Sequence, residues 1–268
     1  MNKFLAILMA LVLTGSIAYA QHTNVGTSNG NNNDIDFVQG FDGSGTAYDG
    51  NEAYADQVGN NNEIDIKQLN NGYAGSSEYA EVNQKGNNND GIVDQYNDGH
   101  WALINSNGDN NYAKIKQEGN DNDGEFDQDG NRNEGNSFAF GILNTTYGRQ
   151  LGNDNEIDQD LGNGEATEDS HLSTVQLGNR NYSRQDVEGD GYPGGIDAVR
   201  NIGDVLQRGN NNTARQIMTQ FDGDVMFNEL YGKQLGDNNV LKQEAAGDGN
   251  FSNIMQSGNM NNAVSLQN

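Results

Sequence analysis

The chain has 268 residues, of which 33% are hydrophobic, 36 are glycine, one is proline and none is cysteine. So few apolar residues cannot build a thick globular core, and without cysteine no disulfide bond can replace one. The formal net charge of −25 argues against binding to nucleic acid or to anionic lipid, because both need a basic surface. We interpret the acidity as a means of keeping the chain soluble, and some other device must give it order.

Residues 1–20 have the pattern of a secretory signal peptide. The basic start "MNK" precedes the apolar stretch "FLAILMALVLTGSI", and the small residues "AYA" precede Gln21. The apolar stretch is too short for a membrane anchor and no stop-transfer flank follows it. We therefore predict a mature chain that begins at Gln21, leaves the cytoplasm and is not inserted in a membrane. Loss of Lys3 with the signal peptide makes its formal charge −26.

An internal repeat organises the rest of the chain. Aligned on a Gln-x-Gly register, ten units start at residues 28, 57, 84, 106, 128, 150, 176, 207, 234 and 256. Each has Gly two positions later and Asn five positions later, which composition alone would not produce, so the repeat indicates an architecture. The glycines are Gly30, Gly59, Gly86, Gly108, Gly130, Gly152, Gly178, Gly209, Gly236 and Gly258. The asparagines are Asn33, Asn62, Asn89, Asn111, Asn133, Asn155, Asn181, Asn212, Asn239 and Asn261.

The spacing inside each unit predicts a β-strand. After the Asn, every second residue is apolar, small or Gln, as in Ile64, Ile66 and Gln68, and the residues between are mostly polar. This period of two places one face inward and the other outward. In some units the Gln and the apolar residue exchange places, as in Gln159 and Leu161, but both still point inward.

The positions of the insertions predict the fold. The eleven-residue period is unbroken from residue 84 to 161, and elsewhere extra residues follow only every second unit. Two strands per coil would place all these insertions on one edge. We predict an all-β, cross-β solenoid of about ten strand–turn–strand coils over residues 30–268, with loops inserted along one edge. The sole proline, Pro193, lies in the longest insertion, as expected of a residue that cannot donate a ladder hydrogen bond. The insertions follow Gln39, Gln68, Leu161, Val187 and Met218.

Stacked coils would place like residues above one another at the β-sheet spacing of about 4.8 Å. A Gln amide both donates and accepts, so a column of Gln can bond to itself and satisfy groups whose unpaired burial costs roughly 1–3 kcal/mol each. Asn would form a second ladder at the corner, and Gly would supply the positive φ of the turn. The predicted ladder residues are Gln57, Gln84, Gln95, Gln117, Gln128, Gln150, Gln176, Gln207, Gln234, Gln256 and Gln267.

These motifs resemble those of the curlins, the subunits of the curli amyloid fibres on bacterial surfaces, whose repeats have the form Ser-x5-Gln-x-Gly-x-x-Asn-x-Ala-x3-Gln. "SHLSTVQLGNRN" (residues 170–181) matches the first two-thirds, and "NIGDVLQRGNNNTA" (201–214) reaches the family's Ala. "SNGDNNYAKIKQ" (106–117) carries the second half, with Ser in place of the first Gln. The chain departs from the family in having more repeats, one-sided insertions, and often Asn for the leading Ser, as at Asn51, Asn144 and Asn228.

The resemblance implies export through the Sec system, passage through the periplasm and a dedicated outer-membrane pore of a Gram-negative-type cell, and templated assembly at the cell surface. The partners it implies are further copies of the chain, a nucleator subunit and the secretion pore. By analogy, residues 21–29 would be a tail that targets the pore. The implied role is a fibre subunit for adhesion and biofilm matrix; whether it is the major subunit, a nucleator or a decorated relative stays open.

Motifs for catalysis or for a bound cofactor are not found, and we predict that the protein is not an enzyme. His22, His100 and His171 are scattered, and no Gly-x-Ser-x-Gly, His-Glu-x-x-His or P-loop pattern occurs. His100 occupies a position where other units have Asn, so we expect it to be structural. The acidic segment "DNDGEFDQDGNRN" fits neither an EF-hand loop nor the nonapeptide of calcium-binding β-rolls, which leaves only incidental calcium binding by the loops open.

Two other function classes remain as alternatives to the fibre subunit. A monomeric solenoid adhesin or ligand-binding surface protein, including an ice or glycan binder, would present a flat and regular outward face. The outward positions here are an irregular mixture of Asp, Glu, Lys and Asn, which disfavours that class. A calcium-dependent surface-layer protein is the third class, and it predicts that a chelator unfolds the chain.

Overall fold

The computed structural model describes residues 22–41, 50–70, 77–162, 167–188, 198–219 and 227–267. The predicted signal peptide and Pro193 lie outside these ranges, so the predictions about them stay predictions. All regular structure within the ranges is β-strand. Among the described residues, no helix has the length and apolarity needed to span a membrane.

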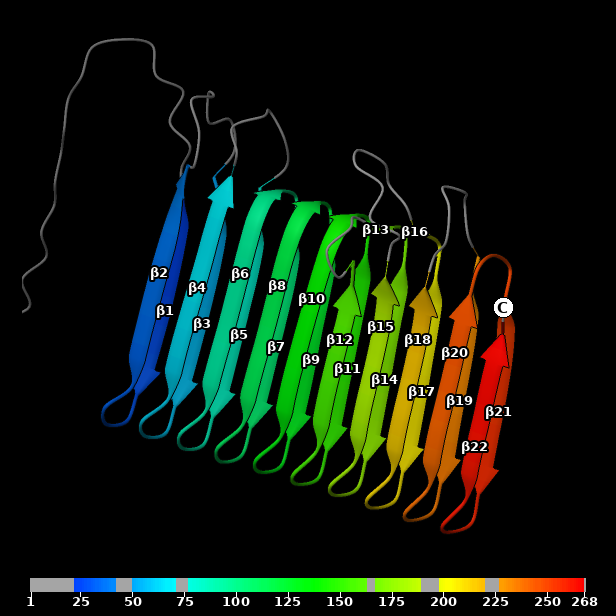
Figure 1. Cartoon of the computed structure of the whole chain (residues 1–268). Coiled ribbons are helices and arrows are strands. Elements are labelled where there is room, and N and C mark those ends of the chain that lie inside the picture. Colours follow the sequence, from blue (N-terminus) through cyan, green and yellow to red (C-terminus); the bar gives the residue numbers. More distant parts are fainter. Residues whose placement is uncertain are drawn as a thin grey trace, which may run out of the picture.

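Two parallel sheets face each other, and consecutive strands alternate between them (Figure 1). Sheet A consists of β1 (Thr23–Asn29), β3 (Glu52–Val58), β5 (Tyr79–Lys85), β7 (Trp101–Asn107), β9 (Asp123–Asp129), β11 (Thr145–Leu151), β14 (His171–Leu177), β17 (Ile202–Arg208), β19 (Glu229–Leu235) and β21 (Phe251–Ser257). Sheet B consists of β2 (Asp34–Phe41), β4 (Glu63–Asn70), β6 (Asp90–Asp98), β8 (Tyr112–Asn120), β10 (Glu134–Ile142), β12 (Glu156–Leu161), β15 (Tyr182–Glu188), β18 (Thr213–Thr219), β20 (Val240–Ala246) and β22 (Asn262–Gln267).

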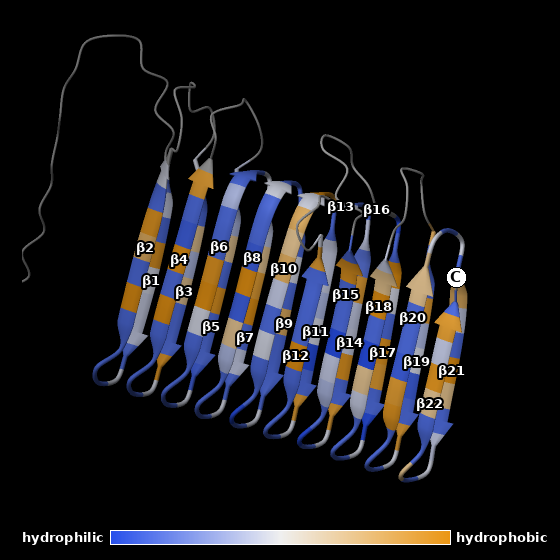
Figure 2. Ribbon diagram, viewed as in Figure 1, coloured by the Kyte–Doolittle hydropathy of each residue, from blue (hydrophilic) through white to orange (hydrophobic). Residues whose placement is uncertain are grey.

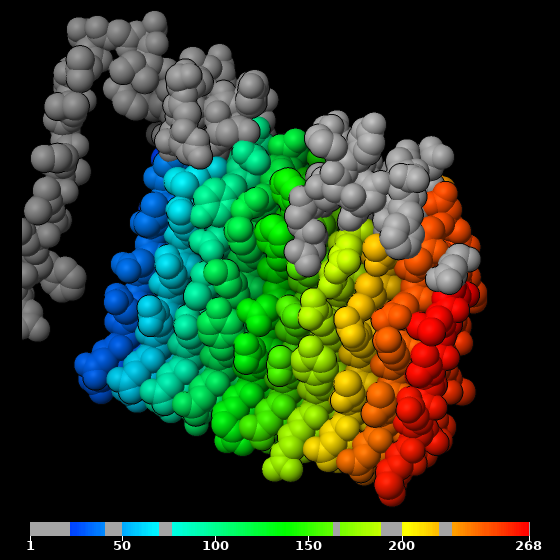
Figure 3. All heavy atoms as spheres, in the orientation of Figure 1, coloured from blue at the N-terminus to red at the C-terminus, as the bar shows by residue number. Residues whose placement is uncertain are grey.

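Each pair of consecutive main strands is one coil, from β1 and β2 in the first coil to β21 and β22 in the tenth. The coils succeed one another from one end of the molecule to the other, as the space-filling view shows (Figure 3). This arrangement confirms the all-β solenoid predicted from the sequence. β1 pairs with β3 along its whole length, so the solenoid begins at Thr23 rather than at residue 30. The pore-targeting role suggested for residues 21–29 stays a prediction.

The short turns lie along one edge of the solenoid, and the connections between coils lie along the other, which we call the insertion edge (Figure 1). The gaps in the described chain follow β2, β4, β12, β15 and β18, and all open at the insertion edge. Two further strands, β13 (Thr167–Glu168) and β16 (Ala198–Val199), pair with each other there, and β13 also pairs with the end of β10. The described residues that flank the insertions therefore lie at one edge, as predicted, while most of the inserted residues lie outside the described ranges.

Each short turn requires glycine for two reasons, as Gly130 shows. Its φ of 132° lies in a region that residues with a side chain rarely adopt. A Cβ added to it would also lie only 1.8 Å from the carbonyl oxygen of Gly152 in the next coil. The turn backbones therefore stack in contact, and the glycine column is a consequence of coil spacing as well as of turn conformation.

The apolar interior is a thin seam between the sheets, and hydrophobic and hydrophilic residues alternate along the strands (Figure 2). Phe126 is the largest fully buried side chain, and two inward glycines make room for it. A Cβ on Gly148 would approach the Phe126 ring to 2.1 Å, and one on Gly135 would approach it to 2.8 Å. Glycine on neighbouring strands thus makes room for large side chains, because the apolar interior between the two sheets is too thin to hold them otherwise.

Replacing Gly148 by Ala should destabilise the fold by about 1–3 kcal/mol, because the added methyl group overpacks against Phe126. Denaturant unfolding of the freshly purified chain measures this. Gly40→Ala is the matched control, since a Cβ there would meet Leu69 at an ordinary 3.5 Å. Adding Phe126→Leu to Gly148→Ala should recover part of the loss. Equal stability of the Gly148 and Gly40 variants would contradict this account of the seam.

Candidate functional site

One column of amides runs through the interior beside sheet A. Gln128 shows the pattern: its Nε2 donates to Gln150 Oε1 at 2.9 Å and to the carbonyl of Tyr112 in sheet B at 2.8 Å. Each such amide therefore joins successive coils and also bridges the two sheets. Ser106 replaces Gln at one level and donates to Gln128 at 2.9 Å. The column contains Gln57, Gln84, Ser106, Gln128, Gln150, Gln176, Gln207, Gln234 and Gln256, all buried.

A second column lies beside sheet B and contains Gln39, Gln68, Gln95 and Gln117, with Nε2-to-Oε1 distances of 2.5–2.9 Å. It stops where Ala139 pairs with Gln117. A displaced column resumes with Gln159, Gln185, Gln216 and Gln243 at 2.8–2.9 Å, in the units where Gln and the apolar residue exchange places.

The list of ladder glutamines drawn from the sequence therefore combines residues of separate columns. Gln95 and Gln117 do not stack with the Gln57 column. Six glutamines of the sheet B columns were not among the predicted ladder residues. Gln267 lies opposite Ala245 and donates to the Phe251 carbonyl at 2.6 Å instead of to another Gln. The six glutamines that the prediction omitted lie at a fixed spacing after a corner Asn, and this spacing could have identified them. The six are Gln39, Gln68, Gln159, Gln185, Gln216 and Gln243.

The asparagines at the ends of the short turns form a corner column that is hydrogen-bonded from coil to coil. The backbone N–H of Asn111 donates to Asn89 Oδ1 at 3.0 Å, and its Nδ2 donates to the Gly130 carbonyl at 2.8 Å. Its own Oδ1 accepts from the N–H of Asn133 at 3.0 Å. The donation from the backbone N–H to the preceding Asn, the donation from Nδ2 to the following Gly, or both, recur at every predicted corner residue. These residues are Asn33, Asn62, Asn89, Asn111, Asn133, Asn155, Asn181, Asn212, Asn239 and Asn261.

A further column on the short turns, made of asparagines with two aspartates among them, was not predicted from the sequence. The N–H and Nδ2 of Asn131, for example, donate to Asn153 Oδ1 at 2.9 and 3.1 Å. These bonds run from each coil to the next, opposite in direction to the N–H bonds of the corner column. The turn edge is therefore held by two sets of amides with opposed polarity. The members are Asn31, Asn60, Asn87, Asp109, Asn131, Asn153, Asn179, Asn210, Asp237 and Asn259.

The insertion edge has its own corner column, at the position of the leading Ser in the curlin repeat. Asn144 N–H donates to Asn122 Oδ1 at 3.0 Å, and Asn122 N–H donates to His100 Nδ1 at 3.2 Å. Because Nδ1 accepts, His100 is neutral with its proton on Nε2, which donates to the Tyr96 carbonyl at 2.8 Å. Burial lowers the pKa of His100, which agrees with a neutral ring in a structural position.

Glu78 occupies the same column one coil before His100 and is fully buried. Asn51 Nδ2 donates to Glu78 Oε2 at 3.1 Å. Burial, with a smaller contribution from the charge of Asp98, raises the pKa of Glu78 to about 9. Its carboxyl is therefore protonated at neutral pH and acts as an uncharged member of the amide column.

On the outward side of sheet B, burial and then the charge of Asp186 raise the pKa of Asp160 to about 7.

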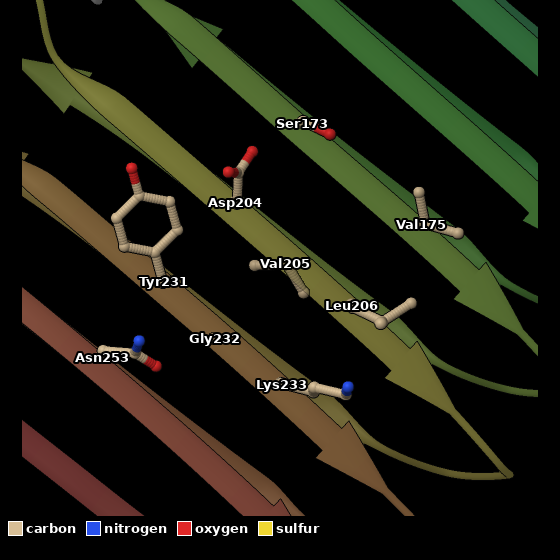
Figure 4. Close-up of a pocket in the computed structure, with 9 residues that line it drawn as sticks. All are labelled: Ser173, Val175, Asp204, Val205, Leu206, Tyr231, Gly232, Lys233 and Asn253. Carbon is tan, nitrogen blue, oxygen red and sulfur yellow. The ribbon is translucent and has the colours of Figure 1, made fainter.

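Shallow hollows lie on the outward faces of the described strands. The one in Figure 4, about 420 Å³, lies on sheet A across β14, β17, β19 and β21, with Val175 and Leu206 beside Asp204, Tyr231 and Lys233. Its side chains project from a nearly continuous sheet surface and do not converge on one point (Figure 4). Among the described residues, no group of three or more His, Asp or Glu side chains could hold a metal ion.

The two ends of the solenoid differ from the interior because their strands have a neighbour on one side. In the described chain, β1 and β2 pair only with the second coil, and β21 and β22 only with the ninth. A Cβ on Gly236 would lie 2.2 Å from the Gly258 carbonyl oxygen. A Cβ on Gly258 would meet nothing closer than 3.6 Å, although its φ of 103° belongs to the same turn conformation. The tenth coil thus has the geometry of an interior coil and open space above it.

Replacing Glu78 by Gln should remove a pH dependence of folding. The folded-state pKa of about 9 exceeds the ordinary value of 4.5, so the stability that Glu78 contributes is fully present below pH 4.5. It is lost as pH rises, by on the order of 1 kcal/mol per pH unit, until the folded pKa is passed. Urea unfolding between about pH 5 and 9 should show a flatter profile for Glu78→Gln than for the unsubstituted chain. Glu81→Gln, three positions away and outward, is the control, and identical profiles for all three would contradict the assignment.

A family model described as the curlin-associated repeat matches residues 49–69 and 86–119. The first segment contains β3 and most of β4, and the second contains β6, β7 and most of β8. A comparison with curated proteins finds no match. The matched segments contain members of the glutamine, corner asparagine and turn glycine columns described above. These matches cover part of the chain and support the assignment to the curlin family that the residue pattern predicted.

Proposed function

We propose that this chain is a secreted structural subunit that polymerises end to end into an extracellular, curli-like cross-β fibre. The observation that carries the proposal is that the tenth coil retains the turn geometry of an interior coil while its outer side is open. An open sheet edge is a template for another chain, and addition of a first coil in the same register would continue the backbone pairing, the turn glycines and the corner asparagines.

The backbone of the short turn is complementary at the two ends. Inside the chain, Gly258 N–H donates to the Leu235 carbonyl at 2.9 Å, and Met260 N–H donates to Asp237 at 3.0 Å. By the same register, Gly30 and Asn32 of a following molecule would donate to the carbonyls of residues 257 and 259. The Asn261 side chain would accept from the following corner Asn and donate to the following Gly, as Asn239 does within the chain.

The interior is also complementary across such a junction. Continuing the register places Ile254 of the tenth coil against Gly26 of the next molecule, and Ala263 against Ile35. Each pair joins a large residue to a small one, as Phe126 and Gly148 do inside the chain. Ile35, Ile254 and Ala263 are only partly buried in the single molecule, so the junction would remove further apolar surface from water.

The finer parts of the proposal rest on the family resemblance. Curlins assemble into fibres outside the cell, so we assign this chain a role in adhesion and biofilm matrix. The resemblance likewise supports a nucleator subunit and a curli-type outer-membrane secretion pore as partners.

Gly258→Ala tests the end-to-end contact, because its methyl group would meet the carbonyl of the next molecule's Gly30, whereas the nearest atom of its own chain, Asn261 Nδ2, lies at an ordinary 3.6 Å. In the chain without residues 1–20, we expect this variant to fold but to add no subunit at the C-terminal end, and to shorten fibres when mixed with the unsubstituted chain. Gly247→Ala is the control: its φ is also positive, at 81°, and nothing lies within 4 Å of its added Cβ. Electron microscopy of length and a meridional reflection at about 4.7–4.8 Å are the measurements.

Two outcomes would contradict the proposal at different levels. Polymerisation of Gly258→Ala at the rate of Gly247→Ala would exclude in-register stacking of the short turns. A lasting monodisperse monomer of the unsubstituted chain would exclude the fibre and favour a monomeric surface protein.

A further inference from the structure

We propose that Gln267 of one molecule donates a hydrogen bond to Gln39 of the next, and that this bond makes the tenth coil specific for a first coil. The proposal rests on the end-to-end function proposed above, and it names the side chains that recognise the partner, a second copy of this chain. The observation behind it is that glutamine on the inward face of sheet B occupies two different positions.

The two positions differ by two residues along the strand. In the first four coils the glutamine lies six residues after the corner Asn, as Gln39 does, and we call this the late position. In the sixth to ninth coils it lies four residues after the corner Asn, as Gln159 does, and we call this the early position. The fifth coil separates the two series, because it has Ser137 at the early position and Ala139 at the late one.

The tenth coil returns to the late position, where its glutamine has no counterpart in the preceding coils. Gln267 pairs in register with Ala245, and the late position is buried and apolar in each of the sixth to ninth coils. The Nε2 of Gln267 donates to the Phe251 carbonyl at 2.6 Å, but its Oε1 is buried without a hydrogen-bond partner in the described chain. An apolar residue would avoid that cost, so a second molecule is the context that explains a glutamine here.

The first coil offers an acceptor for the second Nε2 proton of Gln267. Gln39 donates to Gln68 Oε1 at 2.5 Å, but its own Oε1 is buried and receives no donor from the described residues. In this column each Nε2 donates to the Oε1 of the following coil, as Gln68 does to Gln95 at 2.9 Å. A first coil added to the tenth in the same register aligns Gln39 with Gln267, and the donor and acceptor then have the polarity of the column.

The other two glutamine columns end at the junction. On sheet A, Gln256 would meet Ser28, and on sheet B the early column stops at Gln243 because Ser265 follows it. In the next molecule the residue aligned with Ser265 is Phe37, so a small side chain meets a large one. The tenth coil is therefore complementary to a first coil at both positions, by a hydrogen bond at the late one and by size at the early one.

This match distinguishes the first coil from the other coils of an incoming chain. The sixth to ninth coils would each place an apolar residue, such as Leu161, against Gln267, and a glutamine, such as Gln159, against Ser265. The second to fourth coils also have glutamine at the late position, but their addition would leave the first coil and all its bonds to the second unmade. Addition of the first coil satisfies Gln267 and keeps every bond within the incoming chain.

Gln267→Leu tests the bond in the chain without residues 1–20. Leucine occupies the late position in the sixth coil as Leu161, so the variant should fold, but Gln39 Oε1 of an added molecule would stay buried without a donor. We expect the concentration of soluble chain left at equilibrium with fibres to rise about 5- to 150-fold, which corresponds to roughly 1–3 kcal/mol. Asn262→Leu, also an amide on β22 but outward and exposed, is the control and should change this concentration by no more than about twofold.

Moving the glutamine to the early position separates addition from stability. Ser265→Gln combined with Gln267→Leu gives the tenth coil the pattern of the sixth to ninth, so it would accept from Gln243 and continue the early column. Urea unfolding should show a folded chain at least as stable as the unsubstituted one. Addition should nevertheless be impaired, because the new glutamine meets Phe37 and the leucine meets Gln39. If the double variant polymerises as well as the unsubstituted chain, the role of Gln267 is intramolecular and the proposal is wrong.

Cross-linking identifies the coil that adds. The chain has no cysteine, so fibres grown from a mixture of Leu266→Cys and Val38→Cys chains can be linked only between these two sites or between like sites. Both residues are outward and exposed, at 63% and 49%, and the junction would place them on strands about 4.8 Å apart. A short bismaleimide should therefore yield the mixed dimer. Glu244→Cys, at the same strand position in the ninth coil, replaces Val38→Cys as the control, and an equal yield of its mixed dimer would overturn the choice of the first coil.

The two levels of the argument fail in different ways. Absence of fibres from the unsubstituted chain would overturn both the proposed function and this bond. Fibres with a reflection at about 4.7–4.8 Å, whose soluble concentration is the same for Gln267→Leu and Asn262→Leu, would overturn the bond and leave the fibre function intact.

Discussion

Everything that orders this chain depends on neighbouring coils keeping one register at the β-sheet spacing. The backbone bonds, the Gln columns and the two Asn corners all connect a residue to its equivalent in the next coil. A slip of one residue would turn every Gln of a strand from the interior to the outward face and leave its former partners unpaired. The amides therefore do more than satisfy one another, because they specify the register that the backbone alone would leave free.

This arrangement explains how a chain with so little apolar surface can fold. Buried polar groups are usually a cost, but here Gln128 and Asn111 have partners for most of their donors and acceptors within the neighbouring coils. The apolar seam can then be thin, as long as each large side chain finds a small neighbour. The same logic admits Glu78, since burial keeps its carboxyl protonated and an uncharged acid can occupy an amide position.

The sequence alone predicted the structural features that depend on positions within one repeat. The period of two gave the strands, Gly and Asn at fixed offsets gave the turns, and alternate insertions gave two strands per coil. The predicted ladder did not separate the glutamine columns, although Gln84 begins a Gln-x-Gly turn and Gln95 instead follows the corner Asn89 at a fixed spacing. Nor could the sequence pair Phe126 with Gly148, which depends on contacts between strands that lie apart in sequence. The two-residue strands β13 and β16 have no periodicity to detect, and Asn51 and Asn144 looked like departures from the leading Ser rather than members of a corner column.

The acidic surface opposes the same stacking that the interior favours. In-register coils bring carboxylates such as Asp36 and Asp65 onto adjacent strands, about 4.8 Å apart. In water, two unit charges at that distance repel by about 1 kcal/mol, and salt reduces this further. Each coil also forms several amide bonds in its columns, each contributing about 0.5–1.5 kcal/mol net, besides the backbone bonds of two strands. The attraction therefore exceeds the repulsion for coils already in register, while the repulsion still acts on unfolded chains that have formed no columns. A surface of this kind keeps free chains apart without preventing the addition of a correctly folded end.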